Sequence, residues 1–322
     1  MTLWLPELNA YEPLLNRAEA VRNVETHLKN HLKVLEELVD YGTHLIPRCW
    51  SSSPRGVRDM VTLPILLKQI VGMLDAGAEL VSRGCVDPAM LQLRAIFEAS
   101  VYLDWILQSK SRTRARAYYV WNVRRQLRWI NRGIVGSPEY KAYRKDLQNL
   151  VIESSLDAPE KQKELRLDAK RLSDHLHSPE NIAWNKRFDV RRGGKPYDAD
   201  WYQVLFAKRR SLRFLAGRVK RAPEYRIVYE LGSETMHGSK SDSHVRILEG
   251  RKLGLRSLRE LTEFPFVVQM LMGNAIHAYA AVLDEYRPAE RENFSKKYVE
   301  AWRSVFMTRL TVSYEYMEAT IG

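Results

Sequence analysis

Cysteine is scarce in this sequence, and the motifs of several common enzyme classes are missing. Cys49 and Cys85 are the only two cysteines among 322 residues, which excludes a disulfide framework and a cysteine-based zinc site. The absence of GxxxxGK(S/T), GxGxxG, GxSxG and HExxH excludes nucleotide-binding loops, the α/β-hydrolase elbow and zincins. His237, Asp242 and His244 lack a spacing typical of a metal site, and we therefore expect neither a metal nor a cofactor.

Strand-like alternation of apolar and polar residues is also missing, because it never persists for five residues. Apolar residues instead recur at spacings of three and four, which predicts amphipathic helices. With 45% apolar residues, this pattern predicts an all-α fold, a helical bundle that ends in two long helices. We expect helices at about residues 15–46, 63–81, 87–107, 201–219, 225–237, 255–286 and 289–318.

The middle of the chain differs from the segments on either side, because charged and aromatic residues replace continuous apolar faces. This change predicts three parts. Residues 1–110 form the N-terminal half of the bundle, residues 111–200 form a charged helical insertion, and residues 201–322 form the C-terminal half. Within the insertion, Ser137-Pro138 is typical of a helix start.

The chain is strongly basic. Lys and Arg number 51 against 39 Asp and Glu, a net charge of +12 that favours phosphate-rich or otherwise acidic partners. Residues 1–15 contain no basic leader before an apolar stretch, so we expect a cytoplasmic protein. The stretch Phe264–Leu283 is about as long as a membrane span, but it contains Gln269, Asn274 and His277 and is predicted to be a buried core helix.

One mostly apolar helix carries two opposite charges. Arg94 and Glu98 lie four residues apart, hence on one helical face, and charges among apolar residues are costly unless they are paired. Two interpretations are open. The residues form a structural ion pair, or Arg94 contacts a phosphate while Glu98 orients it or acts as a base.

Polar residues recur every four positions near the end of another predicted helix. Tyr229, Ser233 and His237 share a helical stripe with Arg226, which lies one turn earlier. Gly238 is typical of the position after a helix C-terminus, where the helix dipole favours a protonated imidazole. His237 is therefore the candidate general acid or base, Tyr229 and Ser233 complete the candidate catalytic set, and Arg226 is a candidate phosphate contact. The alternative is a histidine that caps free carbonyl groups.

A third cluster is basic and aromatic. Lys110–Arg132 contains eight basic residues and no acidic one, with tyrosines and tryptophans interleaved. Guanidinium groups pair with phosphates and aromatic faces stack on unpaired bases, so this helix is a candidate nucleic-acid interface. The alternative is an amphipathic helix whose aromatic residues are buried and whose arginines are solvated or paired. The candidate binding residues are Trp121, Arg124, Arg125, Arg128, Trp129 and Arg132.

The last two predicted helices carry more apolar surface than one packing seam needs. We therefore expect a homodimer through this region, and the alternative is that both helices close the core of one chain. The apolar residues concerned are Phe266, Met270, Ile276, Tyr279 and Val282 on the first helix and Tyr298, Trp302, Phe306 and Leu310 on the second.

Four segments, LRAIFEASVYLDWIL, RARAYYVWNVRRQLRW, DADWYQVLF and YRIVYELGSETMHGS, follow one another in an order that resembles an uncharacterised bacterial family of helical domains of unknown function. The resemblance spans about residues 63–286, and its most specific element is the Tyr-x3-Ser-x3-His-Gly-Ser pattern that ends at Ser239. The resemblance further implies a relation to HEPN-like helical bundles, which cleave RNA without a metal in toxins and antiphage systems.

HEPN ribonucleases use an Arg-x4–6-His motif, whereas Arg226 and His237 are separated by ten residues. The motif spacing does occur at Arg22/His27 and at Arg171/His177, about as often as chance predicts.

These clusters and the resemblance together predict an RNA-acting, HEPN-like protein, a metal-independent ribonuclease of a bacterial defence or toxin system. A separately encoded regulatory partner is compatible with such a system. The alternative is a non-catalytic helical module that binds a nucleic acid or a partner protein, and a third interpretation is an enzyme that acts on a small nucleotide.

Overall fold

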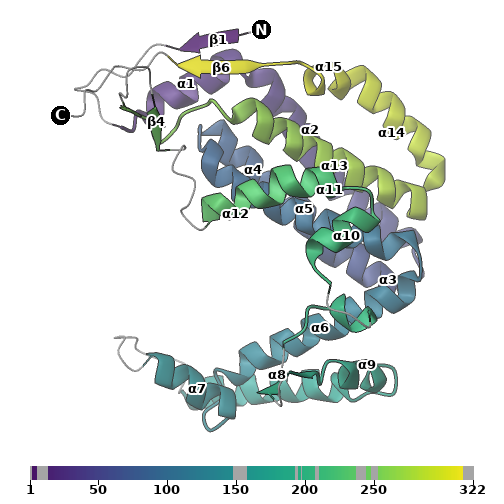
Figure 1. Cartoon of the computed structure of the whole chain (residues 1–322). Helices are drawn as coiled ribbons and strands as arrows, with labels where there is room; N and C mark the ends of the chain where they lie inside the picture. The colour runs from purple at the N-terminus through teal and green to yellow at the C-terminus, as the bar shows by residue number, and fades with distance from the viewer. Residues whose placement is uncertain are drawn as a thin grey trace. The chain divides into compact units, whose positions relative to one another are not determined.

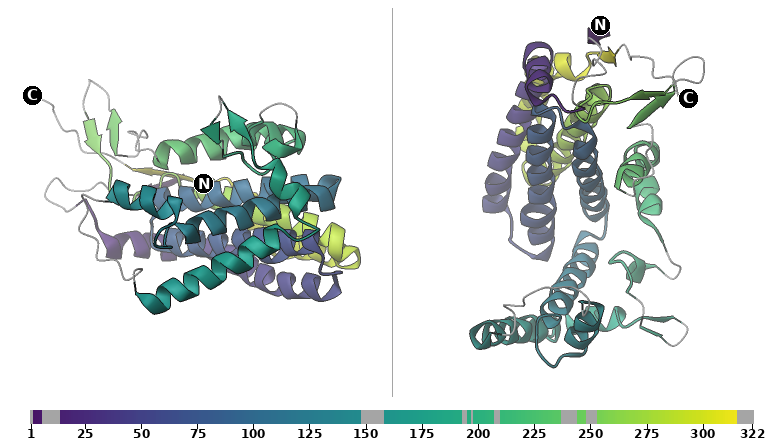
Figure 2. Two further views of the ribbon diagram at one scale, coloured as in Figure 1. Left: turned by 90° about the horizontal axis from the view of Figure 1, so that it is seen from below. Right: turned by 90° about the vertical axis from the view of Figure 1, so that its left-hand side faces the viewer.

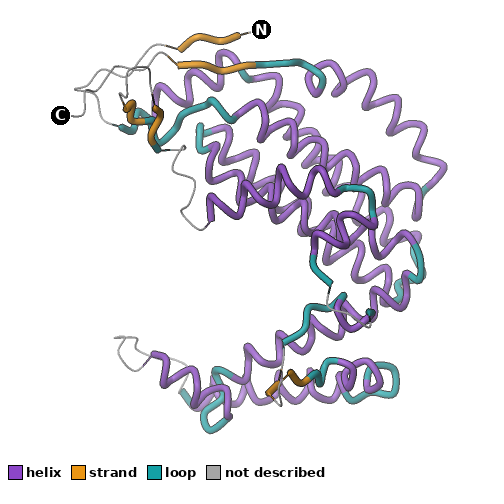
Figure 3. The backbone as a smooth tube through the Cα atoms, viewed as in Figure 1, coloured by secondary structure: helices purple, strands orange, loops and turns teal. Residues whose placement is uncertain are grey.

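The computed structural model describes residues 2–5, 14–147, 158–192, 195–196, 198–206, 210–236, 244–247 and 253–314. Over these residues the fold is all-α, as predicted, and strands form only short pairs (Figure 3). The chain divides into two compact units. Unit 1 comprises residues 1–109 and 212–322, and unit 2 comprises residues 110–211.

Helices α2 (Lys29–Ser52), α4 (Lys68–Ser82), α5 (Val86–Gln108) and α13 (Phe264–Tyr286) form the centre of unit 1. They pack in the cyclic order α2, α4, α5, α13 and back to α2 (Figure 1). Burial of their facing apolar side chains is the main stabilising contribution in such a bundle. The fully buried residues include Leu35, Leu38, Ile70, Leu74, Leu93, Phe97, Val267 and Leu271.

Helices α2 and α13 approach each other closely at Gly42. A Cβ atom at this position would collide with the Tyr279 hydroxyl and would lie 2.6 Å from Val71 Cγ2. The Tyr279 side chain is fully buried and donates a hydrogen bond to the Leu38 carbonyl over 2.9 Å. Burial raises the pKa of Tyr279, so the hydroxyl remains a donor. Glycine is therefore needed at residue 42 for space.

Shorter helices surround this bundle. The π-helix η4 (Tyr225–Glu230) continues directly into α12 (Leu231–Met236), and both pack against α5. The surrounding helices are α1 (Arg17–His27), α3 (Val57–Met60), η1 (Val61–Leu67), α10 (Leu212–Arg218), α11 (Ala222–Glu224), η4 (Tyr225–Glu230), α12 (Leu231–Met236), η7 (Pro288–Glu290), α14 (Arg291–Lys297), η8 (Tyr298–Trp302) and α15 (Arg303–Phe306). Strand β1 (Thr2–Leu5) pairs in parallel with β6 (Thr311–Tyr314), and β4 (Val245–Ile247) pairs antiparallel with β5 (Leu253–Leu255).

Unit 2 is organised around the long helix α6 (Ser111–Asn131). Helix α8 (Pro159–Leu176) runs along it, and α7 (Pro138–Leu147) and α9 (Ile182–Arg187) also pack on it (Figure 2). The predicted helix start at Pro138 is confirmed, because the Ser137 hydroxyl accepts a hydrogen bond from the Tyr140 amide over 2.9 Å. The remaining elements are the two-residue strands β2 (Arg191–Arg192) and β3 (Lys195–Pro196) and the 3-10 helix η3 (Gln203–Leu205).

The predicted single helix over residues 15–46 is two helices. α1 ends at His27 and α2 begins at Lys29, and Leu28 between them has a non-helical backbone (φ −122°, ψ 6°). The Leu28 side chain is fully buried. The apolar spacing therefore continues through residue 28, so the sequence pattern does not indicate the break between the two helices.

Three predicted helices in the C-terminal third are shorter than expected. α10 covers only the end of the predicted helix over 201–219, because Trp201 instead packs in unit 2, edge-on to Tyr118 at 5.3 Å. α13 begins at Phe264 rather than at residue 255, where β5 lies. The last predicted helix ends at Phe306, and Thr311–Tyr314 pairs with residues 2–5, a long-range contact that local periodicity does not report.

Two helical stretches, Val57–Ser82 and Phe264–Tyr286, are long and apolar enough to cross a membrane by length and composition alone. At least half of each apolar window is buried inside the chain. Several residues that motivated the homodimer are also buried within this single chain, namely Tyr279, Val282 and Trp302. The homodimer remains a prediction.

Candidate functional site

Arg94 lies where α5 meets the continuous helix formed by η4 and α12. Its side chain is half-buried, and the guanidinium carbon lies 4.2 Å from the centroid of the Tyr229 ring. Nη1 of Arg94 lies 3.6 Å from Sδ of Met236, the last residue of α12. A guanidinium over an aromatic face at this distance is a favourable cation–π contact. The contact holds the Arg94 head group along α12, toward the end of this helix.

Gly232 makes this close packing of α12 on α5 sterically feasible. A Cβ at Gly232 would lie 3.0 Å from Cβ and 3.3 Å from Cδ of Arg94, and 3.4 Å from the Met90 carbonyl oxygen. These separations are at or below the lower end of ordinary carbon contacts. Glycine therefore leaves the space that the Arg94 stem occupies.

The π-helical geometry of η4 changes which side chains share a face. The rings of Tyr225 and Tyr229 stack at 4.9 Å with an angle of 18° between them. Burial raises the pKa of Tyr225, which keeps its hydroxyl protonated. Arg226, which the α-helical spacing put on the same stripe, has an exposed side chain. A π-turn contains more residues than an α-turn, so Arg226, three residues before Tyr229, moves off this face, whereas Tyr225, four residues before Tyr229, remains beside it.

No ion pair joins Arg94 and Glu98, so the interpretation of these two residues as a structural ion pair is wrong. Oε1 of Glu98 instead accepts a hydrogen bond from the Tyr102 hydroxyl over 2.7 Å. Ser233 is half-buried on α12, and His237, which follows Met236 in the sequence, lies outside the described residues. Of the five candidate catalytic residues, Arg94 and Tyr229 are therefore brought into contact.

Arg94 has no carboxylate partner among the described residues. Its described contacts are with the Tyr229 ring and the Met236 sulfur. A half-buried guanidinium without a counter-ion favours an anion, because a charge that is partly removed from water gains most from pairing. The geometry around Arg94 can therefore accept a phosphate.

A second polar cluster lies between α5, α11 and α13, and sequence analysis missed it. The Arg221 side chain is 4% exposed. Its Nη1 donates to Ser100 Oγ over 2.6 Å and lies 3.3 Å from Asp104 Oδ2, and its Nη2 donates to Asn274 Oδ1 over 2.5 Å. Glu224 Oε2 accepts two further hydrogen bonds from the same guanidinium. Arg221 thereby ties the three helices together through a nearly saturated set of hydrogen bonds.

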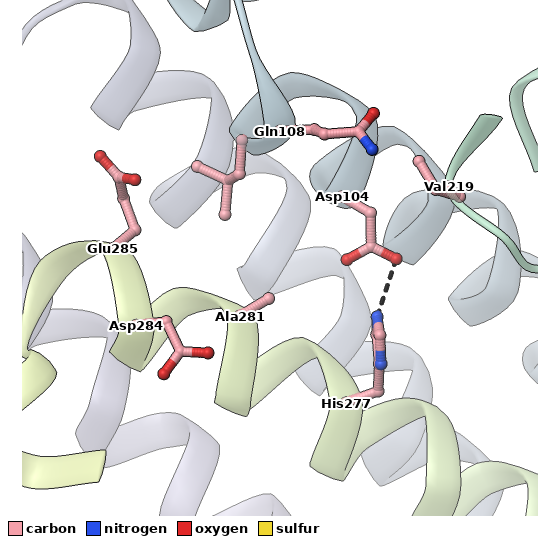
Figure 4. Close-up of a pocket in the computed structure, with 8 residues that line it drawn as sticks. Asp104, Gln108, Val219, His277, Ala281, Asp284 and Glu285 are labelled. Carbon is pink, nitrogen blue, oxygen red and sulfur yellow. Dashed lines mark hydrogen bonds and ion pairs between the residues drawn. The ribbon is translucent and has the colours of Figure 1, made fainter.

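Asp104 also bonds His277 at the edge of a pocket of about 350 Å³. Nε2 of His277 lies 2.9 Å from Asp104 Oδ2, and Figure 4 shows the two side chains pointing toward each other from α13 and α5. The side chain of His277 is 49% exposed, against 10% for Asp104. A histidine oriented by a buried carboxylate can exchange protons.

The lining of this pocket limits what the pair can do. Its lining residues include no serine, threonine or cysteine, so no side-chain nucleophile stands beside His277. Its carboxylates are already paired, Glu285 with Arg58 and Asp284 with Arg291. We therefore assign the Arg221 cluster a structural role. Among the described residues, no group of three or more His, Cys, Asp and Glu side chains is arranged to hold a metal ion.

The sequence did contain a signal for this cluster. Ser100, Asp104 and Gln108 recur every four residues within the apolar helix α5, and Asn274 and His277 lie three residues apart within the apolar helix α13. Polar residues at helical spacing in two apolar helices indicate a shared polar contact. Arg221 carried no such signal, because it lies in a short connection.

In unit 2 the structure separates the candidate arginines, which lie in α6 or, for Arg132, at its C-cap, into two kinds. Arg124 donates to the Asn185 carbonyl and to Asp189, each over 2.9 Å, and Arg128 lies 2.9 Å from Asp198. The remaining candidates are paired with tryptophans. The guanidinium carbon of Arg125 lies 4.6 Å from the Trp121 ring centroid, and that of Arg132 lies 4.8 Å from the Trp129 centroid.

The net charge of the chain is concentrated in unit 2. Residues 110–211 carry 24 basic and 12 acidic residues, which accounts for the entire +12 of the chain. The residues of unit 1 are balanced, with 27 basic and 27 acidic residues. The attraction that a basic protein exerts on polyanions therefore originates in unit 2.

The model of a family of unknown function matches residues 61–251, more than half of the chain. The matched stretch contains both Arg94 and the Tyr-x3-Ser-x3-His pattern from Tyr229 to His237. The predicted resemblance to an uncharacterised family is thereby confirmed. No curated protein and no solved structure matches the chain.

Proposed function

The chain belongs to the family of unknown function DUF5677, and we propose that this member is a cytoplasmic, HEPN-like ribonuclease that cleaves RNA without a metal in a bacterial defence or toxin system. The observation that carries the proposal is the position of Arg94. Its guanidinium lies against Tyr229 and Met236, the residue directly before His237 in the sequence. A phosphate-binding cation together with a histidine that transfers protons is the minimum equipment for metal-independent RNA cleavage.

The proposed reaction uses the RNA's own 2′-hydroxyl as the nucleophile. A general base removes the proton of the 2′-hydroxyl, and the oxygen attacks the adjacent phosphorus. The bond from phosphorus to the 5′-oxygen breaks, and a general acid protonates the leaving oxygen. The products are a 2′,3′-cyclic phosphate and a 5′-hydroxyl end, and no oxidant, reductant or further reactant is needed.

Arg94 and His237 take the central parts in this proposal. Arg94 stabilises the negative charge that grows on the phosphate oxygens, and His237 exchanges a proton with the reacting or leaving oxygen. Tyr229 holds the Arg94 guanidinium through the cation–π contact. Arg226, which is exposed, contacts a neighbouring phosphate.

Glu98 and Ser233 have supporting parts. Glu98 is bonded to Tyr102 on the same helix and does not pair with Arg94, so it leaves the guanidinium free for phosphate. Ser233 lies four residues before His237 in the sequence and is half-buried on α12, a position from which its hydroxyl is a hydrogen-bond donor for an RNA oxygen.

The proposal is tested by expressing wild type and His237→Ala in bacteria and scoring growth together with the integrity of total RNA. We expect wild type to slow growth and to fragment RNA, and the variant to do neither at equal protein level. RNA fragmentation by the His237→Ala protein at the wild-type level would refute the proposal. If the trigger is absent in the host, purified protein on labelled RNA gives the same comparison.

A second function is supported by a separate observation, the concentration of the whole net charge in unit 2. In this alternative the protein is a non-catalytic module that binds a nucleic acid. It predicts that charge reversal at Arg125 and Arg132 abolishes binding, whereas His237→Ala changes neither binding nor any cellular effect. The two functions are therefore distinguished by the same pair of variants.

A further inference from the structure

We infer that α6 binds single-stranded RNA through two arginine–tryptophan pairs, Trp121 with Arg125 and Trp129 with Arg132, and that Arg124 and Arg128 do not take part. The inference deepens the proposed function, since it names the form of RNA that the protein recognises and the residues that bind it. It rests on unit 2 alone and does not require that the protein cleaves RNA.

The first support is the division of the arginines by their contacts. Arg124 and Arg128 each form a salt bridge with a carboxylate of unit 2, Asp189 and Asp198 respectively, so part of their charge is already compensated. Arg124 is further fixed by the Asn185 carbonyl, so it joins α6 to α9. A guanidinium already bonded to a carboxylate and a carbonyl would have to break both contacts to bind a phosphate, which weakens the binding it can provide.

Arg125 and Arg132 are different, because their side chains are exposed and neither has a carboxylate partner in the described part of the chain. Each guanidinium lies over an indole, at 4.6 Å for Arg125 and 4.8 Å for Arg132. The cation–π contact orients the guanidinium while it leaves its N–H groups free to donate. Two such cations, oriented by their indoles, are suited to binding successive phosphates of one strand.

The indoles supply the second support. Trp129 is 67% exposed, although burial of such a side chain would be strongly favourable. Arg132 lies over the ring, and the exposed remainder of the indole is free to stack on a base. Trp121 is half-buried and packs against Tyr118 at 6.0 Å, so its ring is held in place. Aromatic side chains of this kind are stacking platforms for unpaired bases.

The spacing of the two pairs fits a nucleic-acid strand. Trp121 and Trp129 are eight residues apart, hence close to one face and about 12 Å apart along the helix. Three to four stacked nucleotides cover that length at about 3.4 Å each. The two pairs are therefore able to act on the same short segment of RNA.

The same features select a single strand over a duplex. In a duplex the bases are stacked on one another, so their faces do not reach an indole on a protein surface. A duplex would still be attracted by the charge of unit 2, but it would gain nothing from Trp129. A single strand gains both the electrostatic attraction and the stacking of its bases on the indoles. The preference for unpaired RNA therefore depends on the tryptophans, and the overall affinity depends on the arginines.

The experiment uses the full chain with His237→Ala, so that substrate is not consumed, and measures fluorescence anisotropy of a labelled oligouridylate of about 20 nucleotides and of an RNA duplex of the same length. We expect tighter binding of the single strand. The Trp129→Ala change should weaken single-strand binding about fivefold or more, with little effect on the duplex. Equal affinity of the His237→Ala protein for the two RNAs would overturn the inference.

Arginine variants provide the matched control. Arg125→Ala with Arg132→Ala should reduce single-strand affinity at least tenfold and lower the slope of log affinity against log salt by about 1.4, since each phosphate contact contributes about 0.7. Lys163→Ala with Lys170→Ala removes the same charge from exposed positions of α8 and should change the slope much less. Indistinguishable slopes for the two double variants would contradict the inference.

Cleavage separates this inference from the proposed function. With His237 intact, the Arg125→Ala/Arg132→Ala protein should cleave a long single strand more slowly at low RNA concentration, because it binds the strand less tightly, and should approach the wild-type rate at saturating RNA. If the chain binds single strands in the predicted way but does not cleave them, the ribonuclease proposal fails and the binding inference stands. Equal rates of long-strand cleavage by wild type and by the Arg125→Ala/Arg132→Ala protein at low RNA concentration would contradict the binding of RNA by α6.

Discussion

The guanidinium carbon of Arg94 lies 4.2 Å from the centre of the Tyr229 ring, a contact that joins α5 to η4 although the two residues are far apart in the sequence. The contact positions a cation without neutralising it, since a π-face attracts a positive charge but leaves the N–H groups able to donate. An arginine held in this way can bind a phosphate with little loss of side-chain entropy. This relationship is the basis of the ribonuclease proposal.

Replacement of Gly232 by alanine should disturb Arg94 without removing any functional group. The new methyl group would lie 3.0 Å from the Arg94 Cβ, so the side chain must shift by a few tenths of an ångström. We expect cleavage activity to fall roughly ten- to hundredfold, because small misplacements of catalytic groups are costly. The measurement is the rate of RNA cleavage by purified Gly232→Ala protein.

Gly217→Ala is the control for that variant. Gly217 lies in α10, and no atom stands within 4 Å of the position that its Cβ would take. Alanine there should leave cleavage unchanged and raise helix stability by up to about 1 kcal/mol. Equal activity of the Gly217→Ala and Gly232→Ala proteins would show that the packing of α12 on α5 does not position Arg94.

Gly42→Ala should destabilise unit 1. Its Cβ would collide with the buried Tyr279 hydroxyl, which must then move away from the Leu38 carbonyl. Overpacking of this kind costs about 1–3 kcal/mol, and loss of the hydrogen bond adds about 1 kcal/mol. Urea denaturation measures the free energy of unfolding. Gly72→Ala, in the adjacent helix α4 with no atom within 4 Å of the new Cβ, should stabilise the protein instead.

Removal of Arg221 should be one of the most damaging single changes in unit 1. The Arg221→Met variant leaves Asp104 and Glu224 without the guanidinium, removes the donor to Ser100 Oγ, and leaves Asn274 Oδ1 with its longer hydrogen bond from Ser100 Oγ, over 3.3 Å. Removal of one partner from a buried ion pair costs about 3–5 kcal/mol. Thermal melting checks the expectation.

His277→Ala serves as the comparison, because it removes a half-exposed partner of the same carboxylate. We expect a loss of about 1 kcal/mol or less, as for exposed ion pairs. Similar melting temperatures for Arg221→Met and His277→Ala would contradict the structural role assigned to the Arg221 cluster.

Acid should destabilise the protein through His31. Burial lowers the pKa of His31 below its ordinary value of 6.5, and its Nδ1 atom is buried without a hydrogen-bond partner among the described residues. Below about pH 6.5 the unfolded chain therefore binds a proton at His31 that the folded chain resists binding. The contribution of the neutral ring is complete above pH 6.5 and is lost as the pH falls.

The test compares the free energy of unfolding at pH 7 and pH 5 for wild type and for His31→Leu. The variant should lose less stability than wild type on acidification, because leucine does not titrate. Parallel losses in the two proteins would show that His31 is not a source of acid sensitivity.

The sequence was sufficient for the fold class, because helical periodicity is a local property. α5 lies close to its predicted range, since it is long and begins with an Asp-Pro pair typical of a helix start. The break at Leu28 was not predictable in this way, because the buried side chain keeps the apolar spacing intact. The pairing of residues 2–5 with Thr311–Tyr314 depends on the ends of the chain meeting, which no local pattern encodes.

The candidate site was predictable as a set of residues but not as an arrangement. Arg94 and Tyr229 stood out because a charge within an apolar helix and a repeated polar stripe are visible in the sequence. Their contact depends on the close packing of α12 on α5, which Gly232 makes possible. The Arg221 cluster was not predicted, because its members lie far apart in the sequence. Ser100 and Asn274, for example, belong to two different helices.

The most direct test of the account is the rate of cleavage of a labelled single-stranded RNA by purified protein in the presence of a metal chelator, compared between wild type and Arg94→Lys. Lysine keeps the positive charge, but its ammonium group lacks the planar shape and the several fixed donors with which the guanidinium lies over Tyr229. The account predicts cleavage by wild type with cyclic-phosphate ends, and a rate about 10²-fold lower for Arg94→Lys at unchanged melting temperature. Equal rates for the two folded proteins, or cleavage that stops when the chelator is added, would contradict it.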